Sequence, residues 1–258
     1  TEGPRVDGWG RIFFKRRTDR IVSLLIAIIA VVLVIAGCIG LTADDFFPVA
    51  LGGIALGLLL GAFAAHLAVA DFRCQEWGVM QSNLFGKRKL LYRDIESFTY
   101  RAVRNFVNGA YTGSSLYLQF TARPGCGRPI SHSSNVQGDD DELDRLRDVV
   151  SHIIAAQMRV RLADGEQVAW TNNLAFTQDG LIYRPSGMLM RGKEQLLPYQ
   201  NYQGYQLENG YFYLFEKGKD RSILTESVGE ANFFPGFYLL LQLAHSPAEG
   251  EAAAVEPK

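Results

Sequence analysis

Residues 90–98 read LLYRDIESF, and residues 196–205 read LLPYQNYQGY. From Tyr92 and from Tyr199 onward, the two phrases keep one residue type at each position: aromatic, polar, Asp or Asn, bulky apolar, Glu or Gln, small, aromatic. A phrase that recurs 107 residues later, counted from Tyr92 to Tyr199 (199 minus 92), indicates an internal repeat. We therefore expect two copies of one small domain, with the phrase marking a turn that enters a strand.

The flanking sequence extends the repeat. FRCQEWGVMQSN (72–83) is echoed by LAFTQDGLIYRP (174–185), with Gly180 in the place of Gly78. The copies lie 102 residues apart at these glycines (180 minus 78) and 107 apart at the tyrosines (199 minus 92), so the second copy has a longer early loop, SGMLMRGKEQ (186–195).

Each copy has a β-rich part followed by a helix. SLYLQFTA (115–122) alternates apolar and polar residues, as a half-buried strand does. DDDELDRLRDVVSHIIAAQM (139–158) instead has apolar residues every three or four positions, and FFPGFYLLLQLAH (233–245) predicts a second helix. The apolar positions of the first helix are Leu143, Leu146, Val149, Val150, Ile153, Ile154 and Met158.

Two apolar segments near the start predict a membrane hairpin. Residues 21–41 carry no formal charge and are about as long as a hydrocarbon core is thick. Residues 49–70 form a second such segment after a short loop, and a secretory signal peptide is the alternative for the first. Lys and Arg flank the pair but are absent from the loop, which predicts that both termini are cytoplasmic.

A membrane hairpin followed by strands and a closing helix resembles bacterial membrane proteins that carry cytoplasmic PH-like (pleckstrin-homology-like) domains. The resemblance implies a helical hairpin plus an α+β part, with two PH-like units, each an antiparallel sheet or barrel closed by a C-terminal helix. The expected parts are a basic juxtamembrane segment (1–20), membrane helices (21–41 and 49–71) with an extracytoplasmic loop (42–48), PH-like domains (72–160 and 161–246) and a flexible tail (247–258).

Small residues in the second membrane segment predict close helix packing. Gly53, Gly57, Gly61 and Ala65 recur every four residues, a spacing that lets another helix approach closely. We favour packing against the first helix of the same chain, with packing against another subunit as the alternative; both could hold on different faces.

His66 is an ionisable residue within the second membrane segment, where such residues are functional candidates. Ala62 and Ala70 flank it four residues away on each side and would leave room for a flat pigment or haem on the imidazole. The alternative is an interfacial histidine bonded to a carbonyl or to water.

Basic residues supply candidates for contact with anionic lipid headgroups or an acidic partner: Trp9, Arg16, Arg17, Lys87, Arg88, Lys89, Arg101 and Arg104. Trp9, Arg16 and Arg17 belong to a segment of mixed aromatic and cationic composition, typical of the membrane interface. The alternatives are a mere topology signal for this segment and a solvated hairpin for the others.

The sequence contains none of the Walker, GxGxxG, GxSxG, HExxH or EF-hand patterns, and no metal site is predicted. We therefore expect a non-catalytic scaffold or accessory subunit of a larger membrane complex, bioenergetic or photosynthetic for example, in the bacterial inner membrane. Its expected partners are integral membrane subunits and anionic lipids, not nucleic acid. The alternatives are an anionic-lipid-binding or signal-sensing PH-like module, or an enzyme with an unrecognised site.

Overall fold

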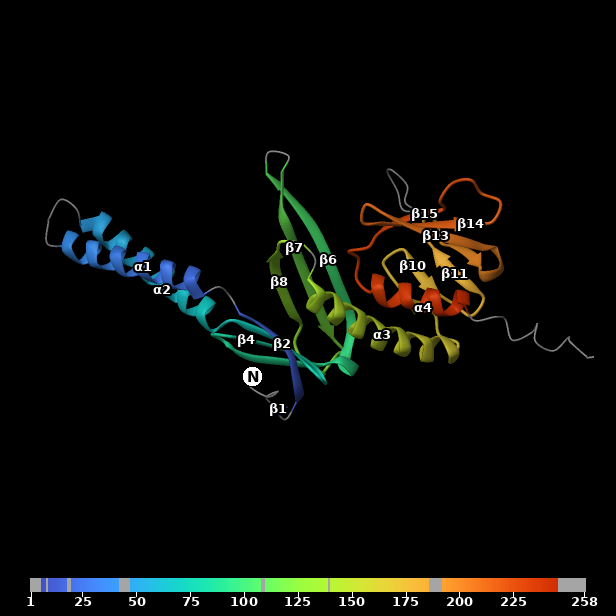
Figure 1. Ribbon diagram of the computed structural model, residues 1–258, viewed down its shortest axis with the longest axis horizontal. Helices are drawn as coiled ribbons and strands as arrows, with labels where there is room; N and C mark the ends of the chain where they lie inside the picture. The colour runs from blue at the N-terminus through green and yellow to red at the C-terminus, as the bar shows by residue number, and fades with distance from the viewer. Residues whose placement is uncertain are drawn as a thin grey trace, which may run out of the picture. The chain divides into compact units, whose positions relative to one another are not determined.

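The computed structural model describes residues 6–7, 9–17, 20–41, 47–107, 110–138, 140–185 and 192–245 (Figure 1). The chain divides into two compact units, residues 1–91 and 92–258. Most of the expected loop 42–48 and all of the tail 247–258 lie outside the described residues. The first unit contains β1 (Val6–Asp7), β2 (Gly10–Arg17), α1 (Arg20–Gly40), α2 (Phe47–Val69), β3 (Asp71–Gln75), β4 (Gly78–Asn83) and β5 (Gly86–Leu91).

Helices α1 and α2 are long and apolar enough to cross a membrane, and they lie side by side in the first unit (Figure 1). The buried small residues are Ser23, Ala30 and Gly37 on α1 and Ala50, Gly57 and Ala64 on α2. Both sets are spaced seven residues apart, close to two full turns, whereas a four-residue stripe drifts by about 40° per step. For this reason Ala65, the last member of the predicted stripe, is exposed, and Ala64 packs against α1 in its place.

The three predicted glycines of α2 face α1. A Cβ on Gly57 would come within 2.8 Å of the Ala30 carbonyl oxygen, so only glycine fits there without a shift. Cβ atoms on Gly53 and Gly61 would meet α1 at ordinary contact distances of 3.7 and 3.9 Å. The hairpin therefore uses its glycines to join its own two helices.

The first unit also contains a five-stranded antiparallel sheet in the order β1-β2-β3-β4-β5. Strand β2 pairs with β3, which places Arg17 opposite Asp71 and Phe14 opposite Cys74. We had expected residues 10–17 to be part of a juxtamembrane segment outside the domain that begins at residue 72. Because β2 precedes α1 and β3 follows α2, the helical hairpin is inserted between two neighbouring strands of one sheet.

The second unit begins with the 3-10 turn η2 (Tyr92–Asp94) and continues with β6 (Ile95–Val107), β7 (Ala110–Ala122), β8 (Ile130–Val136) and α3 (Asp141–Ala163). It ends with β9 (Val168–Ala169), β10 (Leu174–Phe176), β11 (Gly180–Tyr183), β12 (Gln195–Pro198), the 3-10 turn η3 (Tyr199–Asn201), β13 (Tyr202–Glu208), β14 (Tyr211–Glu216), β15 (Leu224–Ser227) and α4 (Phe233–His245). Its antiparallel sheets are β6-β7-β8, β12-β11-β10-β9 and β13-β14-β15.

The element order is duplicated. Each copy runs through four paired strands, a 3-10 turn, three paired strands and a helix: β2 to β5, η2, β6 to β8 and α3, then β9 to β12, η3, β13 to β15 and α4. The α+β composition with two apolar helices is therefore present. Of the two expected alternatives, sheet or barrel, the described strands form antiparallel open sheets and no closed barrel.

The second copy is organised around Trp170. Its indole nitrogen donates to the Phe233 carbonyl at 2.8 Å, and its ring packs on Phe176 and Phe212 with centroids 5.1 and 5.4 Å away. A Cβ on Gly236 would meet the indole, so glycine lets α4 approach this closely. Helix α4 thereby covers the strands of the second copy (Figure 1).

Helix α3 follows the predicted periodicity in part. Leu143, Leu146, Val150, Ile154 and Met158 are buried, whereas Val149 is 48% exposed. Asp140 caps the helix by accepting a hydrogen bond from the backbone nitrogen of Leu143 at 3.2 Å. Asp140 therefore caps the start of the helix, a position where aspartate is favoured.

Candidate functional site

The first unit carries a cationic sheet at the end that adjoins the apolar helices. Lys15 and Arg73 lie beside Asp71, with nitrogen–oxygen distances of 2.9 and 2.8 Å. Burial alone would raise the pKa of Asp71, but hydrogen bonds from Arg73 and Lys15 hold it below its ordinary value. The one carboxylate of this cluster is therefore ionised and neutralised, and it does not cancel the neighbouring basic run 87–89.

Lys87, Arg88 and Lys89 are exposed on the edge strand β5. The ammonium of Lys89 lies 4.9 Å from the ring centroid of Trp9, a cation–π contact that joins two of the predicted residues. Arg16 makes a similar contact with Phe14 at 5.8 Å. Arg17 is the last residue of β2, and its side chain lies outside the described part.

The β4–β5 turn is apolar. Leu84 and Phe85 are 52% and 85% exposed, and the turn is held by Asn83, whose side-chain oxygen accepts from the backbone nitrogen of Phe85 at 3.0 Å. The Phe85 ring centroid lies 5.8 Å from that of His66. The turn therefore sits beside the last turn of α2, and the face of His66 expected to hold a pigment or haem has an aromatic neighbour.

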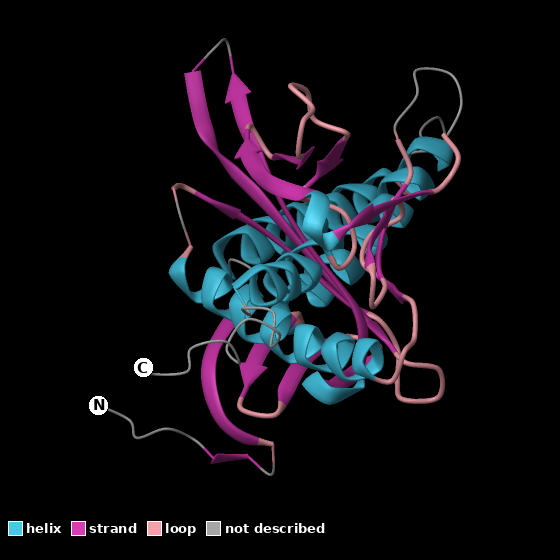
Figure 2. Ribbon diagram, turned by 90° about the vertical axis from the view of Figure 1, so that its right-hand side faces the viewer, coloured by secondary structure: helices cyan, strands magenta, loops and turns pink. Residues whose placement is uncertain are grey.

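On the second unit, β6 and β7 form a long twisted hairpin that extends past its pairing with β8 (Figures 1 and 2). Beyond that pairing the side chains of Phe106, Val107 and Tyr111 are 60%, 59% and 47% exposed. Phe106 and Tyr111 face each other across the strands with ring centroids 5.9 Å apart. An exposed apolar hairpin end of this kind is typical of an interaction surface.

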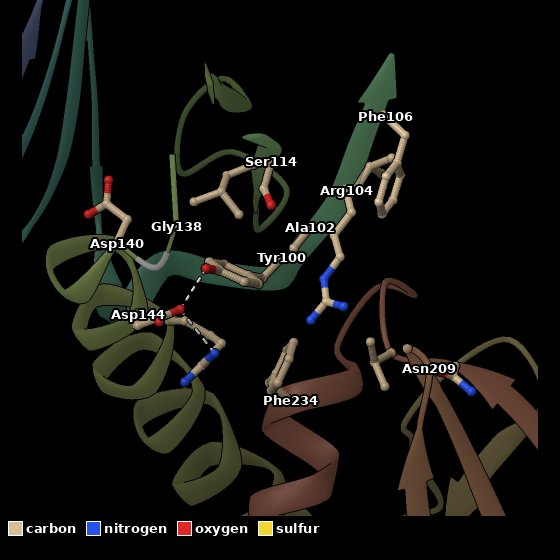
Figure 3. Close-up of a pocket in the computed structure, with 15 residues that line it drawn as sticks. Tyr100, Ala102, Arg104, Phe106, Ser114, Gly138, Asp140, Asp144, Asn209 and Phe234 are labelled. Carbon is tan, nitrogen blue, oxygen red and sulfur yellow. Dashed lines mark hydrogen bonds and ion pairs between the residues drawn. The ribbon is translucent and has the colours of Figure 1, made fainter. Parts of the chain in front are cut away.

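A groove of about 760 Å³ opens beside this hairpin, between β6, the start of α3 and the start of α4 (Figure 3). Tyr100 donates a hydrogen bond to Asp144 at 2.6 Å, and Arg147 binds the same carboxylate at 3.1 Å. The guanidinium also lies over the rings of Tyr100 and Phe234, at 5.3 and 4.9 Å from their centroids. Figure 3 shows Arg104 extending from β6 on the same side.

Tyr100 and Arg147 of this cluster both keep their protons at neutral pH. Burial, followed by the hydrogen bond to Asp144, raises the pKa of Tyr100. Burial would lower the pKa of Arg147, but Asp148 and then Asp144 raise it. At neutral pH the groups form a fixed tie between β6, α3 and α4. Among the residues that the structure describes, no group of three or more His, Cys, Asp and Glu side chains is placed to hold a metal ion.

The predicted basic residues divide between the two units. Lys87, Arg88 and Lys89 belong to the first unit, and Arg101 and Arg104 to the second. Arg101 lies against Gly229, with a nitrogen–oxygen distance of 3.5 Å to its carbonyl. Sequence reasoning missed the exposed Leu84–Phe85 turn, although an apolar pair next to GKRK was a visible signal. It also missed the tie between Tyr100 and Asp144, which no local pattern could reveal.

Comparisons with known proteins found no matching family model, no matching curated protein and no matching solved structure.

Proposed function

We propose that this chain is a non-catalytic, membrane-anchored scaffold or accessory subunit of a larger membrane complex in the bacterial inner membrane. The helical hairpin anchors it, both termini are cytoplasmic, and its partners are integral membrane subunits. The duplicated strand order, with a helix at the end of each copy, supports assigning each copy to a PH-like unit.

The exposed end of the β6–β7 hairpin is the observation that carries the proposal. Phe106, Val107 and Tyr111 present apolar surface on two paired strands, where a soluble protein without a partner usually has polar residues. Aromatic residues are enriched where proteins bind proteins, because they bury a large area at low entropic cost.

The proposal is tested by native electrophoresis of membranes solubilised in mild detergent. We expect the chain to migrate in a complex larger than itself and Phe106→Ser with Val107→Ser to release it as a smaller species. The matched control is Val160→Ser with Leu196→Ser, which removes two similarly exposed side chains (62% and 51%) elsewhere on the second unit. A wild-type chain that migrates alone, or a hairpin variant that migrates like wild type, contradicts the proposal.

The cationic β5 strand favours a second candidate function, binding of anionic lipid. Lys87, Arg88 and Lys89 are exposed on the unit that contains the membrane helices. Flotation of the full chain in vesicles does not separate binding by β5 from simple anchoring, so the readout must be the lipid that the chain retains. If variants neutral at these three positions retain as much anionic lipid as wild type, this function is ruled out.

A further inference from the structure

We propose that the Leu84–Phe85 turn inserts into the bilayer interface beside the end of α2, while Lys87 and Arg88 hold anionic lipid headgroups. The inference rests on the membrane anchoring in the proposed function and assigns a lipid-contacting surface to the first unit. It does not depend on the β6–β7 hairpin.

Register places the turn at the depth of the apolar helix. Ser82 is paired with Asp71, and Asp71 lies two residues after Val69, the last residue of α2. From Ser82 the chain runs back about 10 Å to Phe85 at about 3.3 Å per residue. From Asp71 the helix runs back about 7.5 Å to His66 at 1.5 Å per residue. The ring contact between Phe85 and His66, at 5.8 Å, agrees with this arithmetic.

The geometry of the turn does not explain its apolar residues. Asn83 pairs with Gly86, which leaves Leu84 and Phe85 as the two turn residues. Leu84 and Phe85 do not have positive φ, which falls instead on Gly86 at 128°, so polar residues would fit these two positions as well as apolar ones. The β13–β14 hairpin has a different turn, with φ angles of 52° and 80° at Asn209 and Gly210, and it reverses the chain without exposed apolar side chains at these two positions.

The apolar turn therefore has a purpose other than reversing the chain. Phe85 is the more exposed of the pair at 85%, and its ring lies beside His66 of the membrane helix. Apolar side chains at this depth are removed from water when the bilayer surrounds α2.

The charges next to the turn fit a headgroup layer. Lys87 and Arg88 come after Gly86, two and three residues beyond Phe85, where the proposed apolar insertion ends. Asp71, the carboxylate across the sheet, is already bound by Lys15 and Arg73. An apolar tip followed by two exposed cations matches the order of acyl chain and anionic headgroup at a membrane surface.

The test uses a nitroxide label on the full chain in nanodiscs that contain phosphatidylglycerol. Native cysteines are replaced by Cys38→Ser, Cys74→Ala and Cys126→Ser, and the label is attached through Phe85→Cys. The matched control is Trp77→Cys, an exposed aromatic residue (59%) in the β3–β4 turn at the opposite end of the same sheet. The measurement is relaxation by oxygen, which enters lipid, against relaxation by a water-soluble nickel chelate.

We expect the oxygen-to-nickel ratio at position 85 to be about threefold higher than at position 77. Equal ratios overturn the insertion, and so does a label at position 85 that neither reagent reaches, since a protein surface would then cover the turn. Either result leaves the electrophoresis test of the proposed function unaffected, which keeps the two failures distinguishable.

The headgroup contact is tested separately with Lys87→Gln plus Arg88→Gln. Native mass spectrometry should show the ratio of retained phosphatidylglycerol to phosphatidylcholine falling about fivefold. The control pair, Arg159→Gln plus Lys217→Gln, removes two exposed cations from the second unit and should leave the ratio unchanged. An equal fall in both pairs, or in neither, overturns the assignment of headgroup binding to this strand.

Discussion

The two copies of the repeated phrase have the same backbone and different charges. In the first, a Cβ on Gly78 would lie 2.2 Å from the Leu90 carbonyl oxygen; in the second, a Cβ on Gly180 would lie 2.2 Å from that of Leu197. Each phrase then forms a 3-10 turn whose last carbonyl accepts a backbone hydrogen bond from the far side of the next hairpin. These bonds are Arg123 to Asp94 at 2.9 Å and Lys217 to Asn201 at 2.8 Å.

The charged residues, unlike the backbone, differ between the two copies. In the pairing that aligns Leu90 with Leu197, the residues Lys87, Arg88 and Lys89 correspond to Glu194, Gln195 and Leu196. Since the second copy builds the same pair of strands without cations, the fold does not require them in the first. Gly78 and Gly180 therefore belong to the residues that build the repeat, whereas Lys87, Arg88 and Lys89 are available to the first copy for another use.

The largest effect should come from the shared glycines. Gly78→Ala and Gly180→Ala each force a side-chain carbon against a paired strand, and we expect either to reduce the free energy of unfolding by about 3 kcal/mol. Hydrogen exchange should localise the loss to β4–β5 in one case and to β11–β12 in the other. Gly52→Ala, where nothing described lies within 4 Å, is the control. If both variants melt at the wild-type temperature, the two copies do not share a structural requirement for glycine at these positions.

The next effect tests how the second copy is joined to β6. Asn232 accepts from the Phe98 nitrogen at 2.9 Å and donates its own backbone nitrogen to the Phe98 carbonyl at 2.7 Å, at a φ of 58°. Asn232→Ala loses the acceptor and strains the backbone, so we expect a loss of about 1.5 kcal/mol in thermal melting. Asn232→Asp keeps the acceptor and should lose less. If the two variants melt alike, the side-chain bond is not what joins these segments.

The tyrosines of the second phrase should make that copy sensitive to alkali. Burial raises the pKa of Tyr199 and of Tyr202 to about 12, from an ordinary value of 10.0. Their contribution to stability is complete below pH 10.0 and is lost as pH rises from there toward 12, because the unfolded state ionises first.

The Tyr199 hydroxyl also donates to the Thr177 carbonyl at 2.9 Å. Tyr199→Phe should therefore cost about 1 kcal/mol at neutral pH, and it should melt with a weaker dependence on pH than wild type above pH 10.0. Melting midpoints measured across this range check both statements. Identical pH dependence in the two proteins would contradict a role for Tyr199 ionisation.

The smallest effect on stability should come from exchanging the charges between copies. Lys87→Glu, Arg88→Gln and Lys89→Leu give the first copy the residues of the second, and we expect the melting free energy to change by about 0.5 kcal/mol or less. Circular dichroism should stay the same while retention of anionic lipid falls. A large loss of stability would show that the fold of the first copy requires these cations, which contradicts the conclusion drawn from the second copy.

Local pattern was sufficient where neighbouring residues decide the structure. The alternation in residues 115–122 predicts a strand with Leu116, Leu118 and Phe120 inside, and all three are buried. The repeated phrase also predicts a turn entering a strand, which η2 with β6 and η3 with β13 confirm. At these turns the backbone carbonyls of Asp94 and Asn201 accept hydrogen bonds from the backbone nitrogens of Arg123 and Lys217.

Pattern was insufficient where distant segments meet. A basic, aromatic segment before a long apolar helix is typical of a lipid anchor, yet residues 10–17 form a strand whose partner lies beyond both helices. The sequence predicts that α2 packs through small residues spaced four apart, because Gly53, Gly57 and Gly61 recur at that spacing. In the structure the buried residues of α2 are instead seven apart, since two straight helices come into contact at about every seventh residue.

The sequence by itself therefore determined the apolar hairpin, the duplication, the strand alternation and the capped helix, because each depends on the order of adjacent residues. Only the tertiary structure decided which strands pair across the inserted hairpin, which face of α2 meets α1, and that Phe85 lies beside His66. These contacts join residues far apart in the chain, and their free energy depends on shape and burial that no single segment contains.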